Sequence, residues 1–176
     1  MNFLIGDIGN TKTKICLIES KSFKVKKLLN FDSKKIVSKN FLQKFLKDDF
    51  NKKKLGRVSL FSSVVPNYYS KIKKLLKNKY KIELREIKEK SINKIVKINI
   101  KNKKQIGSDR IANAVGVYKK YKSNCIVLDF GTATTFDVVT KNGSYNGGII
   151  APGVNLSLDI LVKKADQIPR FLIKKQ

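Results

Sequence analysis

Residues 7–14 of the chain read DIGNTKTK, and residues 129–137 read DFGTATTFD. Each stretch directly follows an apolar, β-like run and carries the pattern Asp-x-Gly, then Asn or Thr, then Thr or Ala. Because each leads into a second β-like run, the pattern predicts a strand, a tight turn and a returning strand. The same unit occurs twice, and we call the two stretches the first and second Asp-x-Gly segments.

The chemistry of this pattern suits a phosphate-binding turn. An Asp at a strand end can hold a cation or its waters, and a Gly permits positive φ and lets backbone N–H groups approach phosphate oxygens. The Thr hydroxyls add donors, and Lys14 adds a positive charge. A single turn of this kind is more often an ordinary β-hairpin. Its repetition, with Thr directly downstream each time, favours the phosphate-binding interpretation over the hairpin alone. Neither a Walker loop nor a dinucleotide-binding glycine fingerprint occurs.

Apolar periodicity around the two segments predicts strands alternating with helices. Strands are expected over residues 2–8, 14–19, 58–64, 81–87, 95–100, 125–129, 134–140 and 144–150. Helices are expected over residues 35–47, from Pro66 onward, from Gly107 to Tyr121, and from Gly153 to Lys164. The alternation, together with the β-hairpins, indicates an α/β fold. The polar stretch 101–105 separates an expected N-terminal domain, residues 1–105, from a C-terminal domain, residues 106–176.

The composition limits the class of protein. The chain has 176 residues, 41% of them hydrophobic, and this share excludes a disordered polycation despite the net charge of +26. No apolar run approaches the roughly 18 residues that a membrane span needs, and we expect no signal peptide. The absence of His excludes His-based triads and His metal sites. Cys16 and Cys125 lie in apolar runs, so we expect reduced core thiols in a cytoplasmic protein.

The positive charge does not by itself indicate a nucleic-acid partner. Only four of the 39 basic residues are Arg, the side chain whose planar fork suits base and phosphate contacts. The Lys residues are scattered through every segment beside abundant Asn and Ile, as in a chain encoded by an A/T-rich genome. We therefore expect no specific nucleic-acid partner, although a pI near 10.1 favours weak, salt-sensitive binding to polyanions.

Four blocks in a fixed order resemble the type III pantothenate kinases, a family that also includes the Bvg accessory factor homologues. They are DIGNT at 7–11, GSDRIAN at 107–113, DFGTATTFD at 129–137 and YNGGIIAPG at 145–153. A weaker fifth block, ADQIP, follows at 165–169. The ordered set covers the chain from end to end and is specific, although no single block is.

The resemblance implies two ribonuclease-H-like domains of the acetate and sugar kinase, chaperone and actin superfamily, with the nucleotide between them. It implies ATP-dependent phosphorylation of the terminal hydroxyl of pantothenate, the first committed step toward coenzyme A. Mg²⁺ with ATP, a monovalent cation (K⁺ or NH₄⁺) and a homodimer are implied as well. The same resemblance assigns Gly107, Ser108, Asp109 and Arg110 to pantothenate, Asp109 also as general base, and Asp129 to the monovalent cation. It assigns to ATP the residues Asp7, Ile8, Gly9, Asn10, Thr11, Lys12, Thr13, Lys14 and Thr132.

Asp109 also has a purely structural interpretation. It stands at the start of a predicted helix, with Ser108 expected as the N-cap, where a carboxylate stabilises the helix through its dipole by about 0.3–1 kcal/mol. As a general base, the same carboxylate would orient the attacking hydroxyl and accept its proton. Arg110 could pair with the substrate carboxylate or the transferring phosphoryl group. The surrounding blocks favour the catalytic role.

The resemblance also raises an expectation about length. Members of the family run on for some tens of residues past the position of Gln176, so we expect a fragment, a frameshifted product or a shortened protein with an incomplete second domain. A kinase therefore stands beside an alternative, a non-catalytic binding or regulatory protein that keeps the fold. In the fourth block, Gly147 and Gly148 either bring backbone close to a ligand or turn a strand where a side chain would clash. Pro152 and Gly153 are expected to start the last helix.

Overall fold

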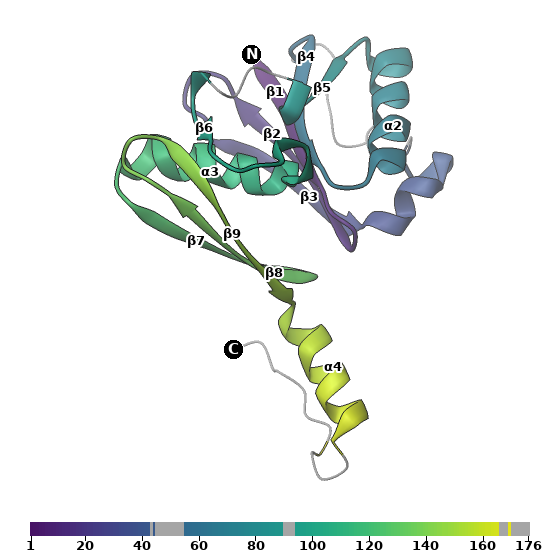
Figure 1. Ribbon diagram of the computed structural model, residues 1–176. Coiled ribbons are helices and arrows are strands. Elements are labelled where there is room, and N and C mark those ends of the chain that lie inside the picture. The colour runs from purple at the N-terminus through teal and green to yellow at the C-terminus, as the bar shows by residue number, and fades with distance from the viewer. Residues whose placement is uncertain (43, 45–54, 90–93, 166–168, 170–176) are drawn as a thin grey trace.

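The computed structural model describes residues 1–42, 44, 55–89, 94–165 and 169. These residues form two β-sheets with helices packed against them (Figure 1). The strands are β1 (Asn2–Ile8), β2 (Lys12–Glu19), β3 (Val25–Asp32), β4 (Val58–Ser63), β5 (Glu83–Glu86), β6 (Lys97–Ile98), β7 (Cys125–Phe130), β8 (Ala133–Val139) and β9 (Ser144–Pro152). The helices are α2 (Pro66–Leu75), α3 (Ser108–Tyr121) and α4 (Val154–Lys164), with the short turns η1 (Ser33–Val37), η3 (Leu76–Tyr80), η4 (Ile87–Glu89) and η6 (Lys103–Gln105).

The first sheet has the strand order β3-β2-β1-β4-β5. Strands β1, β2 and β3 form an antiparallel meander, and β4 and β5 add to it in parallel with β1. A parallel pair needs a crossover connection, which α2 and η3 supply between β4 and β5. Pro66 starts α2, where its missing N–H breaks no helical hydrogen bond. The buried core of this half is Leu4, Ile8, Ile15, Leu29, Phe31, Ile36, Leu42, Phe61, Ile72, Leu76, Ile82 and Leu84.

The second sheet repeats the antiparallel meander. Its order is β6-β9-β8-β7, and β7, β8 and β9 pair in antiparallel fashion as β1, β2 and β3 do. Helix α3 packs on one face of it over a separate core of Val96, Ile98, Ile106, Ile111, Ala114, Val139 and Tyr145. Strand β6 pairs with β9 although it precedes residue 105, so the chain enters the second sheet before the predicted domain boundary. The boundary itself stays a prediction.

Most predicted elements occur where the sequence pattern put them. Strand β1 and helices α3 and α4 have the predicted extents, whereas β5 and β6 have only four and two residues. Strand β3 was not predicted, because the Lys and Asn residues in VKKLLNFD interrupt its apolar alternation. The helix predicted over residues 35–47 starts as the 3-10 turn η1 and continues at residues 39–42, and the rest of it lies mostly outside the described residues.

The second sheet leaves the face opposite α3 exposed. Ile126, Leu128 and Phe130 alternate along β7 on this face and are 66%, 50% and 67% exposed. Val138 on β8 pairs with Ile126, and Ile149 on β9 faces Phe136, so both extend the same apolar surface. Helix α4 continues from β9 and projects beyond both sheets (Figure 1). We call this surface the open face.

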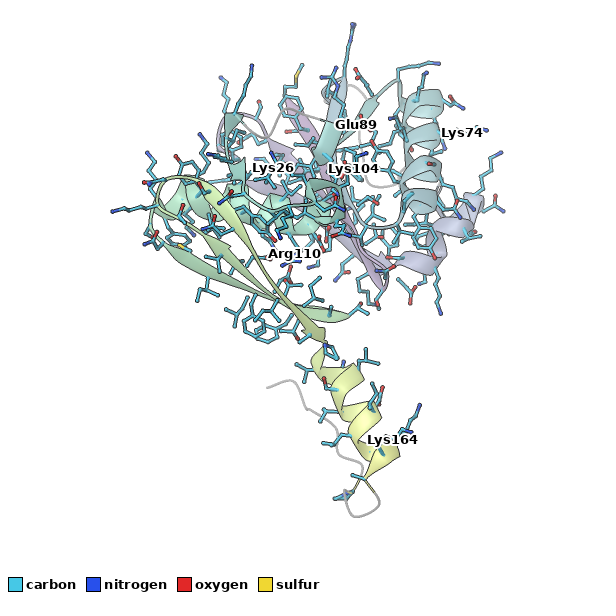
Figure 2. The ribbon with its side chains drawn as sticks, in the orientation of Figure 1. Lys26, Lys74, Glu89, Lys104, Arg110 and Lys164 are labelled. Atoms are coloured by element: carbon cyan, nitrogen blue, oxygen red, sulfur yellow. The ribbon has the colours of Figure 1, made fainter. Side chains whose placement is uncertain are left out.

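The four lysines that Figure 2 labels are exposed, whereas the two thiols are partly buried. Lys26, Lys74, Lys104 and Lys164 belong to β3, α2, η6 and α4, and Figure 2 shows them on separate parts of the molecule. Cys16 and Cys125 are free thiols, as expected, but both are only partly buried, which corrects their assignment to the core. In the part of the chain that the structure describes, no helix has both the length and the apolarity to cross a membrane.

Candidate functional site

The two Asp-x-Gly segments lie against each other. The turn of the first joins β1 to β2 and the turn of the second joins β7 to β8, and the Thr11 and Thr132 hydroxyl oxygens at their tips are 2.7 Å apart. These residues are 121 positions apart in the sequence. The contact brings one strand end from each sheet to a common location, as a two-domain clamp requires.

A buried serine, Ser33, supports the first turn through hydrogen bonds to its backbone. The Gly9 N–H donates to the Lys12 carbonyl at 3.1 Å, which closes the turn. Ser33, at the start of η1, donates its hydroxyl to the Gly9 carbonyl at 2.7 Å and its N–H to the Thr11 carbonyl at 2.9 Å. In a planar trans peptide the N–H points away from the C=O, so the Asn10 N–H is directed away from Ser33.

The predicted ATP-binding residues of the first Asp-x-Gly segment differ in how far their side chains are buried. The side chains of Ile8 and Thr13 are fully buried, and the Thr13 hydroxyl lies 2.8 Å from that of Ser33. Only the backbone of these two residues can therefore contact a ligand. Thr11, Lys12 and Lys14 are exposed, and Lys14 lies directly opposite Asp7 in the β1–β2 register.

The second turn packs against the start of α4. The Gly131 N–H donates to the Ala133 carbonyl at 3.0 Å, and the Gly153 N–H donates to the Thr132 carbonyl, also at 3.0 Å. A Cβ on Gly153 would overlap the Gly131 and Thr132 carbonyls, so this glycine has a packing role at the helix start. Neither Gly9 nor Gly131 has positive φ, contrary to the expected use of glycine flexibility. Their contribution is the absence of a side chain.

Three carboxylates from distant parts of the sequence act on one another here. Burial raises the pKa of Asp7, and the charges of Asp109 and Asp129 raise it further, against the lowering influence of the Ser62 hydroxyl and of Lys14. The described residues contain no group of three or more acidic or Cys side chains close enough to share one metal ion. The carboxylates therefore form an electrostatic cluster that favours a cation, and not a preformed metal cage.

Helix α3 begins at the predicted place but with a different cap. Gly107 is the N-cap, in extended conformation, and Ser108 is the first helical residue, which corrects the expected Ser108 cap. The buried Ser108 hydroxyl donates instead to the Ser63 carbonyl at 3.1 Å and to the Glu86 carboxylate. Because Ser63 and Glu86 belong to the first sheet, this hydroxyl ties the start of α3 to the other half of the molecule.

Asp109 occupies the first turn of α3 beside Gly107. Its Oδ1 accepts the Arg110 N–H at 2.8 Å, and a Cβ on Gly107 would run into this same carboxylate. The missing side chain at Gly107 therefore leaves room for the Asp109 carboxylate. One turn further along α3, Asn113 donates to Asp129 Oδ2 at 2.9 Å, which fixes the orientation of that second carboxylate.

Four residues of this region had no predicted role: Ser33, Asn113, Asp137 and Tyr145. Asp137 and Tyr145 lie inside the quoted blocks, and both are buried next to Arg110. A signal for Asp137 was present, since an Asp inside an otherwise apolar strand needs a partner. Ser33 offers no such signal, because a Ser after a strand is ordinary in sequence.

Comparison with known proteins identifies the family of the chain. The family profile of the type III pantothenate kinases matches residues 3–176. A type III pantothenate kinase of Pelagibacter ubique (strain HTCC1062) is 48% identical over 172 residues, which are 98% of this chain and 67% of that protein. One from Endomicrobium trichonymphae is 36% identical, over 98% of this chain and 70% of the relative.

Solved structures support the fold at low sequence identity. The ethanolamine utilization protein EutJ from Carboxydothermus hydrogenoformans aligns with a TM-score of 0.50 and 12% identity, over 96% of this chain and 58% of that one. A reductive activator for a corrinoid, iron-sulfur protein aligns with a TM-score of 0.50 and 12% identity, over 81% of this chain and 30% of that one. The expected α/β class with ribonuclease-H-like sheets is confirmed. The chain belongs to the type III pantothenate kinase family, whose members are transferases that phosphorylate pantothenate in coenzyme A biosynthesis.

Proposed function

We propose that this chain transfers the γ-phosphoryl group of ATP to the terminal hydroxyl of pantothenate, at a site formed by the two Asp-x-Gly turns and the start of α3. The observation that carries the proposal is the 2.7 Å contact between Thr11 and Thr132. It brings together two turns of the same phosphate-binding type, within electrostatic range of the Asp109 carboxylate. ATP phosphates would lie along these turns, with the Asn10 N–H and the Thr hydroxyls as donors.

The acidic cluster fits the cations that the reaction needs. A kinase of this family uses ATP with a divalent metal ion. Mg²⁺ is usually held by one or two carboxylates plus waters and phosphate oxygens, so the single, partly buried Asp7 carboxylate suits it. Burial, and after it the charges of Asp109 and Asp129, raise the pKa of Asp7, and a bound cation would offset both effects. For the monovalent cation, K⁺ or NH₄⁺, we assign Asp129, whose Oδ2 is held by Asn113.

Asp109 and Arg110 then act on pantothenate. Asp109 orients the terminal hydroxyl and accepts its proton as the hydroxyl oxygen bonds to the γ-phosphorus. The bond from that phosphorus to the β–γ bridging oxygen breaks, and ADP leaves. Arg110 pairs with an oxyanion, either the pantothenate carboxylate or the transferring phosphoryl group.

The assembly and compartment belong to the same proposal. We assign a homodimer as the working form and the cytoplasm as its location, where ATP and pantothenate are both present. The chain spans 67% and 70% of the length of these two relatives. The second candidate is a non-catalytic protein with the kinase fold.

One experiment separates the two candidates. The purified chain is incubated with ATP, Mg²⁺, K⁺ and pantothenate, and 4′-phosphopantothenate is measured by mass spectrometry, with pantothenate omitted as the control. Titration calorimetry with a non-hydrolysable ATP analogue and with pantothenate runs in parallel. Product formation supports the kinase, binding of both ligands without product supports the non-catalytic protein, and absence of both refutes the proposed site.

A further inference from the structure

We propose that buried Asp137 and Tyr145, together with Gly148, form a cradle that positions the Arg110 guanidinium for an oxyanion of the substrates. The inference rests on the proposed function, because it concerns the arginine assigned above to pantothenate or phosphate. Arg110 lies between α3 and the second sheet (Figure 2). The three cradle residues come from β8 and β9 of that sheet.

The first component of the cradle is the Asp137 carboxylate. Arg110 donates from Nε to Asp137 Oδ1 at 2.8 Å, and its Nη2 lies 2.6 Å from the same oxygen. The Asp137 side chain is 0% exposed and that of Arg110 is 12% exposed. Breaking a buried ion pair on one side leaves an uncompensated charge, so the two groups hold each other firmly in place.

Tyr145 fixes the carboxylate in turn. Its hydroxyl donates to Asp137 Oδ1 at 2.6 Å, and its ring lies 6.0 Å from the central carbon of the Arg110 guanidinium. Burial and then the neighbouring Asp137 raise the pKa of Tyr145 far above its usual value, so its hydroxyl stays a donor. The carboxylate oxygen that holds Arg110 is therefore itself held by a rigid aromatic residue of the core.

Gly148 supplies the space that the guanidinium occupies. It pairs with Asp137 in the β8–β9 register, and a Cβ at this position would lie 2.9 Å from Arg110 Nη2 and would overlap the Phe136 carbonyl. Of the two readings of the Gly147–Gly148 pair, steric exclusion at Gly148 is the one that the contacts support. The closest contact is with the Phe136 backbone carbonyl and the next residue is Arg110, so the missing side chain permits the β8–β9 pairing and also leaves room for the guanidinium.

Arg110 presents Nε and Nη2 to the same oxygen, Asp137 Oδ1. We infer that the remaining end of the guanidinium, which carries Nη1, contacts a carboxylate or phosphate oxygen of a substrate. An unrestrained Arg has large rotamer freedom, which ligand binding would have to freeze. Because the cradle fixes the guanidinium beforehand, Asp137 and Tyr145 act as positioning residues for the reaction.

The test is the variant Tyr145→Phe, which removes one donor and keeps the ring. If Arg110 binds the pantothenate carboxylate, we expect the KM for pantothenate to rise about ten-fold. If Arg110 binds the phosphoryl group, we expect kcat to fall about ten-fold. Either change is the size expected for one lost hydrogen bond to a charged group. Tyr69→Phe is the matched control, because the Tyr69 hydroxyl donates to the Leu84 carbonyl at 3.2 Å in the other half of the chain. A change in Tm with KM and kcat unaltered overturns the positioning role.

A second readout does not depend on turnover. The Arg110 Nε–H resonance, identified by its loss in Arg110→Lys, should exchange slowly with solvent in the wild-type chain and at least ten-fold faster in Tyr145→Phe. If the wild-type chain forms no product, the proposed function fails but this measurement still tests the cradle. An unchanged exchange rate in Tyr145→Phe overturns the inference, and a faster rate supports it.

Discussion

Replacing Asp109 with Asn tests the catalytic role of this carboxylate against its helix-stabilising role. The Asn side chain keeps an oxygen at the position of Oδ1, which accepts the Arg110 N–H at 2.8 Å, so the local geometry survives. What disappears is the proton acceptor and one negative charge. Loss of a general base lowers a rate by about 10²–10⁴-fold, which corresponds to about 2.7–5.4 kcal/mol of activation free energy.

The expected effect on stability is much smaller. A charge in the first turn of a helix contributes about 0.3–1 kcal/mol, and in a chain of this size that lowers Tm by about 1–4 °C. The assay measures 4′-phosphopantothenate formation and thermal unfolding of the same samples. Asp159→Asn, which removes the same charge from an exposed position of α4, is the control. An Asp109→Asn variant with near wild-type turnover and a clear loss of stability would show that Asp109 only stabilises the helix.

Three further variants probe the surrounding site. In Asp7→Asn the free energy of unfolding at neutral pH should exceed that of the wild type, because the raised pKa means that ionised Asp7 destabilises the fold. In urea titrations the difference in unfolding free energy should vanish as the pH falls to 3.8, the ordinary pKa of Asp, and below. Gly131→Ala should leave Tm unchanged, since its Cβ meets only the Ala133 carbonyl at 3.7 Å, yet weaken ATP-analogue binding in calorimetry; equal affinity would contradict phosphate placement there. Ser33→Ala should cost about 1–3 kcal/mol by leaving the Gly9 carbonyl unpaired. Ser59→Ala removes a buried hydroxyl that has no hydrogen-bond partner among the described residues, so it should cost less. An equal loss of unfolding free energy in both variants would refute the support of the turn by Ser33.

The fold was predictable wherever the information is local. The Asp-x-Gly turns predict hairpins because a glycine, a polar side chain and two flanking apolar runs specify a turn within a few residues. The start of α3 is equally local, yet its cap was misassigned. Ser108 has the right chemistry for an N-cap, but its hydroxyl is used by Ser63 and Glu86 from the other sheet. Tertiary contacts decided between two locally acceptable arrangements.

The sequence predicts the turns and carboxylates of the candidate site, but not the residues that hold them in place. Asp7 and Asp129 follow directly from the repeated pattern, and the structure brings them into mutual influence with Asp109. Ser33 and Tyr145 act through contacts with residues 24 and eight positions away, across strand pairings that no periodicity reveals. Supporting residues of this kind become visible only when the register of the sheets is known.

The open face of the second sheet links stability to the site. Along β7 one set of alternating side chains, Ile126, Leu128 and Phe130, is entirely apolar, and the other contains Val127 and ends at Asp129. Helix α3 covers only the set that includes Val127, while Ile126 and Phe130 remain largely exposed. Because β7 also carries Asp129 and leads directly into the Gly131 turn, the second half of the site is built on a strand that is packed on one face only, by α3.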